Sequence, residues 1–301
     1  MTTTRPGAWL AQELSIGRER LRDRRRLWAV VLIGVSGGLV ATFLLARGEL
    51  AGSDALAYWA GIRIWLSGGD PYHPPVPYLP YVYAPWSLGL FVPWALLPWS
   101  VAWTLWRGLN IVLLIWSAHW AYSRRPLATA IALALLAAPI AATLDTGNIT
   151  FLLAMLVWAA HFTGPRAAGL LWALATGLKW FPVFFVAVLP PRARLWGVAG
   201  LAAAGVLMLA TWPETLHHLD LAFNFPRPIR IDLALLAWGV IPWLWTRWSL
   251  WALDREGIKA RAREPLTRTA EGWRAWRASS GRATVARRVI GSRVRSFFGV
   301  G

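Results

Sequence analysis

The chain has 301 residues, of which 57% are hydrophobic and 15% are charged, and its mean hydropathy is +0.45. These values lie outside the range of soluble globular domains and indicate a polytopic membrane protein. Because the chain has no cysteine, disulfides and thiol catalysis are excluded. The net charge is +17, but most arginines lie in the two terminal segments, which favours a cytoplasmic face and anionic membrane lipids over nucleic acid.

A basic segment precedes the first apolar stretch. Residues 1–26 end in the arginine run Arg18, Arg20, Arg22, Arg24, Arg25 and Arg26. Leu27–Ala46 follows, which is long enough to span a bilayer and longer than the apolar part of a signal peptide. We therefore expect an uncleaved first span with residues 1–26 in the cytoplasm. The positive-inside rule then places the loop of residues 47–85 on the extracytoplasmic side.

Seven further apolar segments predict an all-α transmembrane bundle of about eight spans within residues 27–251. They are Trp86–Trp99, Val101–Tyr122, Leu127–Leu144, Asn148–Thr163, Ala167–Leu189, Leu195–Trp212 and Leu233–Trp248. Eight spans leave Arg124 and Arg125 on the side that the positive-inside rule disfavours. If the short segment Trp86–Trp99 only dips into the membrane, every later segment inverts.

Two polar regions complete the expected organisation. The interval 213–231 falls on the same extracytoplasmic face as the loop 47–85, so the two loops could form one site. An even number of spans returns the basic tail, residues 252–301, to the cytoplasm, where we expect it to be disordered.

Asp54 is a carboxylate just past the end of the first apolar stretch, and aromatic residues follow it in the sequence. A carboxylate at a membrane surface is a candidate catalytic base for chemistry on a lipid-borne substrate. The alternative is a structural role, because Ser53 and Asp54 are both good N-cap residues for a helix that begins at Ala55.

Three cations could meet an anionic group. Lys179 lies within an apolar segment, where an ionisable side chain costs about 2.5–3.5 kcal/mol and marks a functional candidate. Its alternative partners are the backbone carbonyls freed around Pro182. Arg227 and Arg230 could hold a phosphate by bidentate hydrogen bonds, or they could contact lipid headgroups.

Two histidines stand out in the second polar interval. His217 and His218, with Glu214 and Asp220, could form a metal cluster or an acid–base group. Their spacing matches no regular zinc motif, so we expect no metal and no cofactor. The alternative is a solvated loop at the membrane surface.

Four short motifs follow one another in an order that resembles the polyprenol-phosphate-dependent mannosyltransferases of glycosyltransferase family 87, in the GT-C superfamily. The resemblance covers roughly residues 27–212. The motifs are the Asp54 segment with Tyr58 and the Gly68-Gly69-Asp70-Pro71-Tyr72 turn; Tyr83-Ala84-Pro85 with Pro93 and Pro98; Gly147-Asn148, where the family commonly has Gly-Gln; and Gly169 to Pro182 with the pattern Gly-x-Lys-x-x-Pro.

This resemblance implies a multi-pass plasma-membrane glycosyltransferase with its active site on the extracytoplasmic face. It implies transfer of a sugar, usually mannose, from a polyprenyl-phosphate donor to a cell-envelope glycolipid or glycan. Asp54 matches the family's acidic residue after the first span and would be the base of an inverting transfer. The candidates for binding the donor phosphate are Lys179, Arg63, Arg227 and Arg230, and His217 or His218 could assist.

The chain departs from the family pattern after about Trp212, where family members carry more spans and a longer C-terminal half. This difference supports an alternative without catalysis. In that alternative the chain is a polyprenyl-lipid transporter, or a truncated family remnant that acts as a partner subunit.

Overall fold

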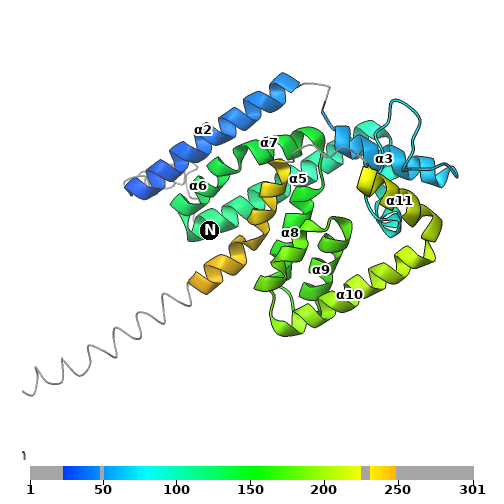
Figure 1. Ribbon diagram of the computed structural model, residues 1–301. Coiled ribbons are helices and arrows are strands. Elements are labelled where there is room, and N and C mark those ends of the chain that lie inside the picture. The colour runs from blue at the N-terminus through cyan, green and yellow to red at the C-terminus, as the bar shows by residue number, and fades with distance from the viewer. Residues whose placement is uncertain (1–22, 48–50, 225–230, 249–301) are drawn as a thin grey trace, which may run out of the picture. The chain divides into compact units, whose positions relative to one another are not determined.

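The computed structural model describes residues 23–47, 51–224 and 231–248 (Figure 1). Every regular element within these ranges is a helix, which confirms the all-α class. The chain divides into two compact units, residues 1–243 and 244–301. In the second unit the structure describes Leu244–Trp248, which are helical. The expected disordered tail, as well as Arg227 and Arg230, lie outside the described residues.

Three helices in the described ranges are long and apolar enough to cross a membrane: α2 (Arg24–Arg47), α5 (Trp99–Arg124) and α10 (Pro191–Ala210). A fourth candidate is the pair α6 (Pro126–Leu135) and α7 (Ala137–Thr146), which is bent by 58° at its junction. The described part of the chain thus contains three or four candidate spans, and the bundle of about eight stays a prediction.

The other expected spans are shorter or interrupted in the structure. The segment expected to be continuous from Ala167 to Leu189 breaks at Lys179, whose backbone is extended with φ −150° and ψ 119°. Pro182, three residues later, limits continuation of the helix because it lacks an amide hydrogen. The elements in question are η2 (Pro85–Ser87), α4 (Leu88–Ala95), α8 (Thr150–Ala160), α9 (Pro165–Leu178), η3 (Phe181–Val188) and η4 (Ile231–Val240).

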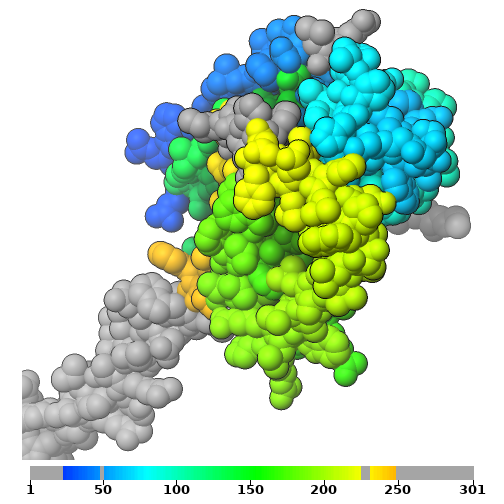
Figure 2. All heavy atoms as spheres, turned by 45° about the vertical axis from the view of Figure 1, so that its right-hand side comes forward, coloured from blue at the N-terminus to red at the C-terminus, as the bar shows by residue number. Residues whose placement is uncertain are grey.

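Two helices of the first unit occupy regions that the sequence predicts as polar loops. Helix α3 (Ser53–Leu66) follows the first span, and α11 (Trp212–Asn224) begins the second polar interval. Figure 2 shows atoms of α11, in yellow, against atoms of the chain that follows α3, in cyan. The two loops that we expect on one face therefore meet.

A cluster of buried tyrosines fixes the segment between α3 and α4. The hydroxyls of Tyr58 and Tyr83 lie 2.7 Å apart, and the Tyr72 hydroxyl donates to the Tyr83 carbonyl at 3.0 Å. The rings of Tyr58 and Tyr83 pack with their centroids 5.1 Å apart. Because each buried phenol finds a polar partner while its ring fills the core, the loop is held firmly to α3.

The long helices expose broad apolar faces. In the most apolar 18-residue stretch of α2, only 11% of the residues are buried inside the protein, and the share is the same in α10. Large apolar side chains that face outward include Val35, Leu39, Leu45, Leu195, Val198, Val206 and Leu209. In water such patches would be unfavourable, whereas hydrocarbon chains solvate them at no cost. The faces indicate that these helices contact lipid.

Helices α9 and α10 approach each other through small residues. A Cβ added at Gly169 would overlap the carbonyl oxygen of Ala193 and lie 2.7 Å from the amide nitrogen of Gly197. Small residues at helix contacts allow such close backbone packing in membranes. The contact holds α10 against α9, the helix that ends at Lys179.

We predict that Gly169→Ala lowers the free energy of unfolding by about 1–3 kcal/mol, because the added methyl forces the two helices apart. The matched control is Gly205→Ala on α10, where a Cβ meets no atom within 4 Å. That control should leave stability unchanged or raise it by up to about 1 kcal/mol. Thermal unfolding of the purified protein in detergent measures both, and equal melting temperatures for the two variants would contradict the packing argument.

Candidate functional site

Asp54 lies in the first turn of α3, and its carboxylate accepts a hydrogen bond from the Asn148 side-chain amide. The N-cap residue of α3 is Gly52, and no side chain caps the helix. The interpretation of Ser53 or Asp54 as the N-cap is therefore wrong. A carboxylate in the first helical turn is nevertheless stabilised by the helix dipole.

The turn between α7 and α8 is fixed against the start of α3. Gly147 ends α7 with a φ of 72°, a left-handed conformation that favours glycine. A Cβ at this position would lie 2.6 Å from the Cβ of Ala55.

Two hydrogen bonds hold this turn in place. The Trp106 indole N–H donates to the Gly147 carbonyl at 2.9 Å, and the Gly52 amide donates to the Asp145 carbonyl at 2.6 Å. These contacts place Asn148 beside Asp54.

The Asn148 side chain joins Asp54 to Lys179. Its Oδ1 accepts from the Thr150 amide at 3.0 Å and from the Lys179 Nζ at 3.3 Å. An ammonium group has only donors, so the amide oxygen must face Lys179 and the amide nitrogen must face Asp54. The candidate base and the candidate phosphate-binding cation are thus bonded to opposite ends of one amide.

Lys179 forms a largely buried ion pair with Asp232. Its Nζ lies 3.5 Å from Asp232 Oδ2, and the two side chains are 13% and 9% exposed. The Thr150 hydroxyl connects the pair, because it lies 2.9 Å from Nζ and 2.8 Å from the same carboxylate oxygen. The hydrogen bonds given for the Lys179 ammonium go to the side chains of Asn148, Thr150 and Asp232.

Sequence reasoning missed Asp232. It directly precedes the apolar segment Leu233–Trp248, and a carboxylate at such a position is a signal for a partner of a lysine placed in another apolar segment. The pairing joins residues 53 positions apart, which no local pattern reveals.

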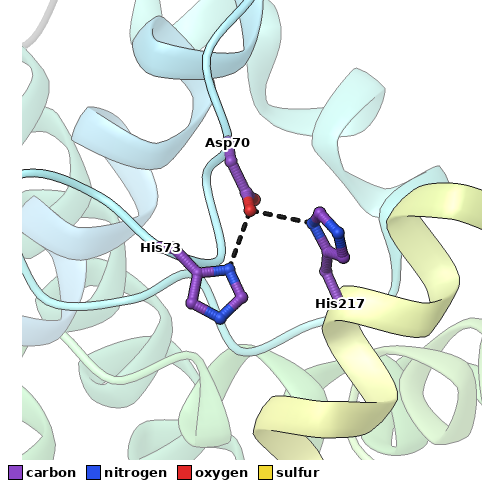
Figure 3. Close-up of side chains that lie close together, drawn as sticks. All are labelled: Asp70, His73 and His217. Atoms are coloured by element: carbon purple, nitrogen blue, oxygen red, sulfur yellow. Dashed lines mark hydrogen bonds and ion pairs between the residues drawn. The ribbon is translucent and has the colours of Figure 1, made fainter.

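A second polar cluster joins the segment after α3 to α11 (Figure 3). Asp70 Oδ2 lies 2.8 Å from Nδ1 of His73 and 2.8 Å from Nδ1 of His217. Burial acts to raise the pKa of Asp70, but the hydrogen bonds from His73 and from the Tyr72 amide outweigh it and lower this pKa below its usual value. Asp70 is therefore a carboxylate at neutral pH.

The grouping of His217 differs from the sequence expectation. Its partners are Asp70 and His73 rather than Glu214 and Asp220, and Asp220 accepts a hydrogen bond from Asn224 on its own helix. Sequence reasoning missed Asp70 and His73 as site residues, although Asp70 stands in the Gly-Gly-Asp-Pro-Tyr motif.

The structure places the side chains of His218 and Arg63 against aromatic rings. The His218 ring packs against the Tyr72 ring with centroids 5.9 Å apart. Arg63 stacks over the Trp59 ring at 4.7 Å. At 1.5 Å per residue, Arg63 lies roughly 13 Å along the α3 axis from Asp54. The loop that carries Asp70 and His73 follows the C-terminal end of the same helix in the chain.

In a comparison with known protein families, residues 81–217 match the model of glycosyltransferase family 87. The matched region contains Asn148, Lys179 and His217, whereas Asp54 and Asp232 lie outside it. Searches of curated proteins and of solved structures gave no significant match. The match indicates a glycosyltransferase, and the long apolar helices indicate a membrane protein. Together they support a membrane glycosyltransferase.

We predict that Asp232→Asn lowers the free energy of unfolding by about 3–5 kcal/mol, because it leaves the buried Lys179 without its counter-charge. The double variant Lys179→Met with Asp232→Leu should recover most of this loss, since it removes both charges. Asp220→Asn, an exposed carboxylate on α11, serves as the control and should change stability by less than about 0.5 kcal/mol. Thermal unfolding provides the measurement, and additive effects of Lys179→Met and Asp232→Leu, each also measured alone, would contradict the pairing.

Proposed function

We propose that this protein transfers a sugar from a polyprenyl-phosphate donor to a hydroxyl of a cell-envelope glycolipid or glycan. Mannose is the first candidate for this sugar. The reaction takes place at the extracytoplasmic face of the plasma membrane and inverts the configuration at the sugar C1. The single observation that carries the proposal is the link from Asp54 through Asn148 to Lys179. A carboxylate and a cation held on one amide are the two charges that such a transfer requires.

In this proposal Asp54 acts as the general base. It takes the proton from the acceptor hydroxyl while the hydroxyl oxygen attacks C1 of the donor sugar. The bond between C1 and the phosphate oxygen breaks, and its electron pair leaves with the polyprenyl phosphate on the opposite face of the sugar. Lys179 stabilises the charge that develops on that phosphate. The Asn148 amide orients the Asp54 carboxylate but transfers no proton.

The charges of the site explain why one cation is insufficient. Asp54 and Asp232 are anionic and Lys179 is cationic, so these three groups sum to −1 when all are ionised. An anionic phosphate needs further positive charge to bind there. Arg227 and Arg230 precede Asp232 in the chain and remain the candidates for this role. Arg63, which is roughly 13 Å along α3 from Asp54, is a weaker candidate.

The decisive test compares Asp54→Asn with Asp220→Asn in membranes that contain equal amounts of protein. Radiolabelled polyprenyl phosphate mannose serves as the donor, and transfer into lipid extract is measured. We expect Asp54→Asn to lose at least about 100-fold in rate, because removal of a general base costs that much or more. Asp220→Asn should transfer at the wild-type rate. Full activity of Asp54→Asn would contradict the assignment of the base.

The alternative is a membrane protein that binds polyprenyl lipid without catalysis. The residues after 217 lie outside the region that matches the family model, and this difference favours the alternative. Under this alternative, well-expressed wild-type protein binds the donor lipid but yields no labelled product with either mannose or another polyprenyl-linked sugar. Label transfer by the purified chain would exclude it.

A further inference from the structure

The cluster of Asp70, His73 and His217 gathers three potential metal ligands from two segments of the chain. Figure 3 shows the carboxylate of Asp70 between the two imidazole rings, with His217 projecting from α11 and His73 from the loop. One ligand atom from each residue lies within 4.8 Å of those of the other two. We propose that these three residues bind one divalent transition-metal cation, with Zn²⁺ the ion that best suits the donor set.

The types of ligand favour this class of ion. Two imidazole nitrogens and one carboxylate oxygen suit zinc and related divalent transition metals, whereas Mg²⁺ and Ca²⁺ prefer oxygen ligands alone. Three protein ligands leave at least one coordination position for water or for an oxygen atom of another molecule. The half-exposed rings, 55% for His73 and 53% for His217, leave such a position accessible.

The distances require only small movements. Zinc binds imidazole nitrogen and carboxylate oxygen at about 2.0–2.2 Å, so two ligand atoms on one tetrahedral ion lie about 3.3 Å apart. Both Nδ1 atoms are 2.8 Å from Asp70 Oδ2, and both therefore face the same carboxylate oxygen. Rotation of three partly exposed side chains by a few tenths of an ångström opens the space for the ion.

The backbone around the cluster is fixed by contacts that do not depend on a metal. Tyr72 is completely buried, and its amide donates to Asp70 Oδ1 at 2.8 Å. The Tyr81 amide donates to the Pro71 carbonyl at 3.0 Å, which closes the loop around Asp70 and His73. The His73 and His217 rings meet edge to face with centroids 5.5 Å apart. Such preorganisation lowers the entropy that binding must overcome.

The proposed ion would fasten α11 to the segment that follows α3. The proposal assigns the ion this structural role and gives it no part in the proton transfer proposed above. The inference therefore stands or falls independently of the proposed function. Metal binding, rather than sugar transfer, is its test.

The experiment uses the full chain, purified in detergent, stripped with a chelator and then titrated with Zn²⁺ by calorimetry. Metal content after gel filtration is measured by mass spectrometry. We expect one ion per chain, and at least tenfold weaker binding for His73→Asn and for His217→Asn. The background is low, because the chain has five histidines and no cysteine.

The matched control is His119→Asn, an exposed histidine on α5, which should bind like wild type. Two results would overturn the proposal: less than one ion bound by wild type, or equal affinity in His217→Asn. The three residues would then form only a hydrogen-bonded contact between the loop and α11.

A second measurement needs no variant and so avoids the question of whether the variants fold. In the wild-type protein, Zn²⁺ should protect His73 and His217 from modification by diethyl pyrocarbonate, but not His119. Mass spectrometry of the digested protein identifies the modified residues. Equal modification of His217 with and without Zn²⁺ would also overturn the proposal.

Discussion

The organisation of the candidate site depends on the hydrogen bonds of the Asn148 side-chain amide. The amide oxygen accepts a hydrogen bond from the Lys179 ammonium, and the amide nitrogen donates one to the Asp54 carboxylate. One planar group therefore orients both charged side chains. This orientation is determined, because the amide cannot be reversed without placing its N–H₂ against an ammonium. Gly147 makes it possible, since only a residue without a Cβ allows the turn to approach Ala55 so closely. An amide here resembles the Gly-Gln of family 87, with a side chain one methylene shorter.

Helix α3 connects the segments that carry the two polar clusters. Asp54 lies in its first turn, and the loop that carries Asp70 and His73 follows its last turn. Buried tyrosines attach that loop to the body of the helix, so movement of one cluster relative to the other would require the core to repack. The two clusters therefore have different roles: one joins charges from three segments around the Asn148 amide, and the other connects the loop to α11.

Composition and apolar runs were sufficient to predict a helical membrane protein, and the first span agrees closely with α2. They also singled out Asp54 and Lys179 as candidates and indicated that the two polar loops could form one site. What they could not show are contacts between distant residues: Lys179 with Asp232, and His217 with Asp70. Apolar content also cannot distinguish a continuous span from a broken one. Lys179 ends α9 because its side chain turns toward polar partners, an outcome that depends on tertiary structure.

If Lys179 binds the donor phosphate as we propose, its pairing with Asp232 sets the energetics of that binding. Burial of a lysine without a counter-charge is unfavourable, and Asp232 supplies the counter-charge when no donor is bound. A phosphate that approaches Lys179 gains the attraction of the ammonium but also meets the repulsion of Asp232. The donor can therefore bind well only if other cations offset the carboxylate, or if Thr150 and Asp232 yield their contacts with Nζ. Such exchange would make the cation of the site available to the donor phosphate while sparing the free protein an unpaired buried charge.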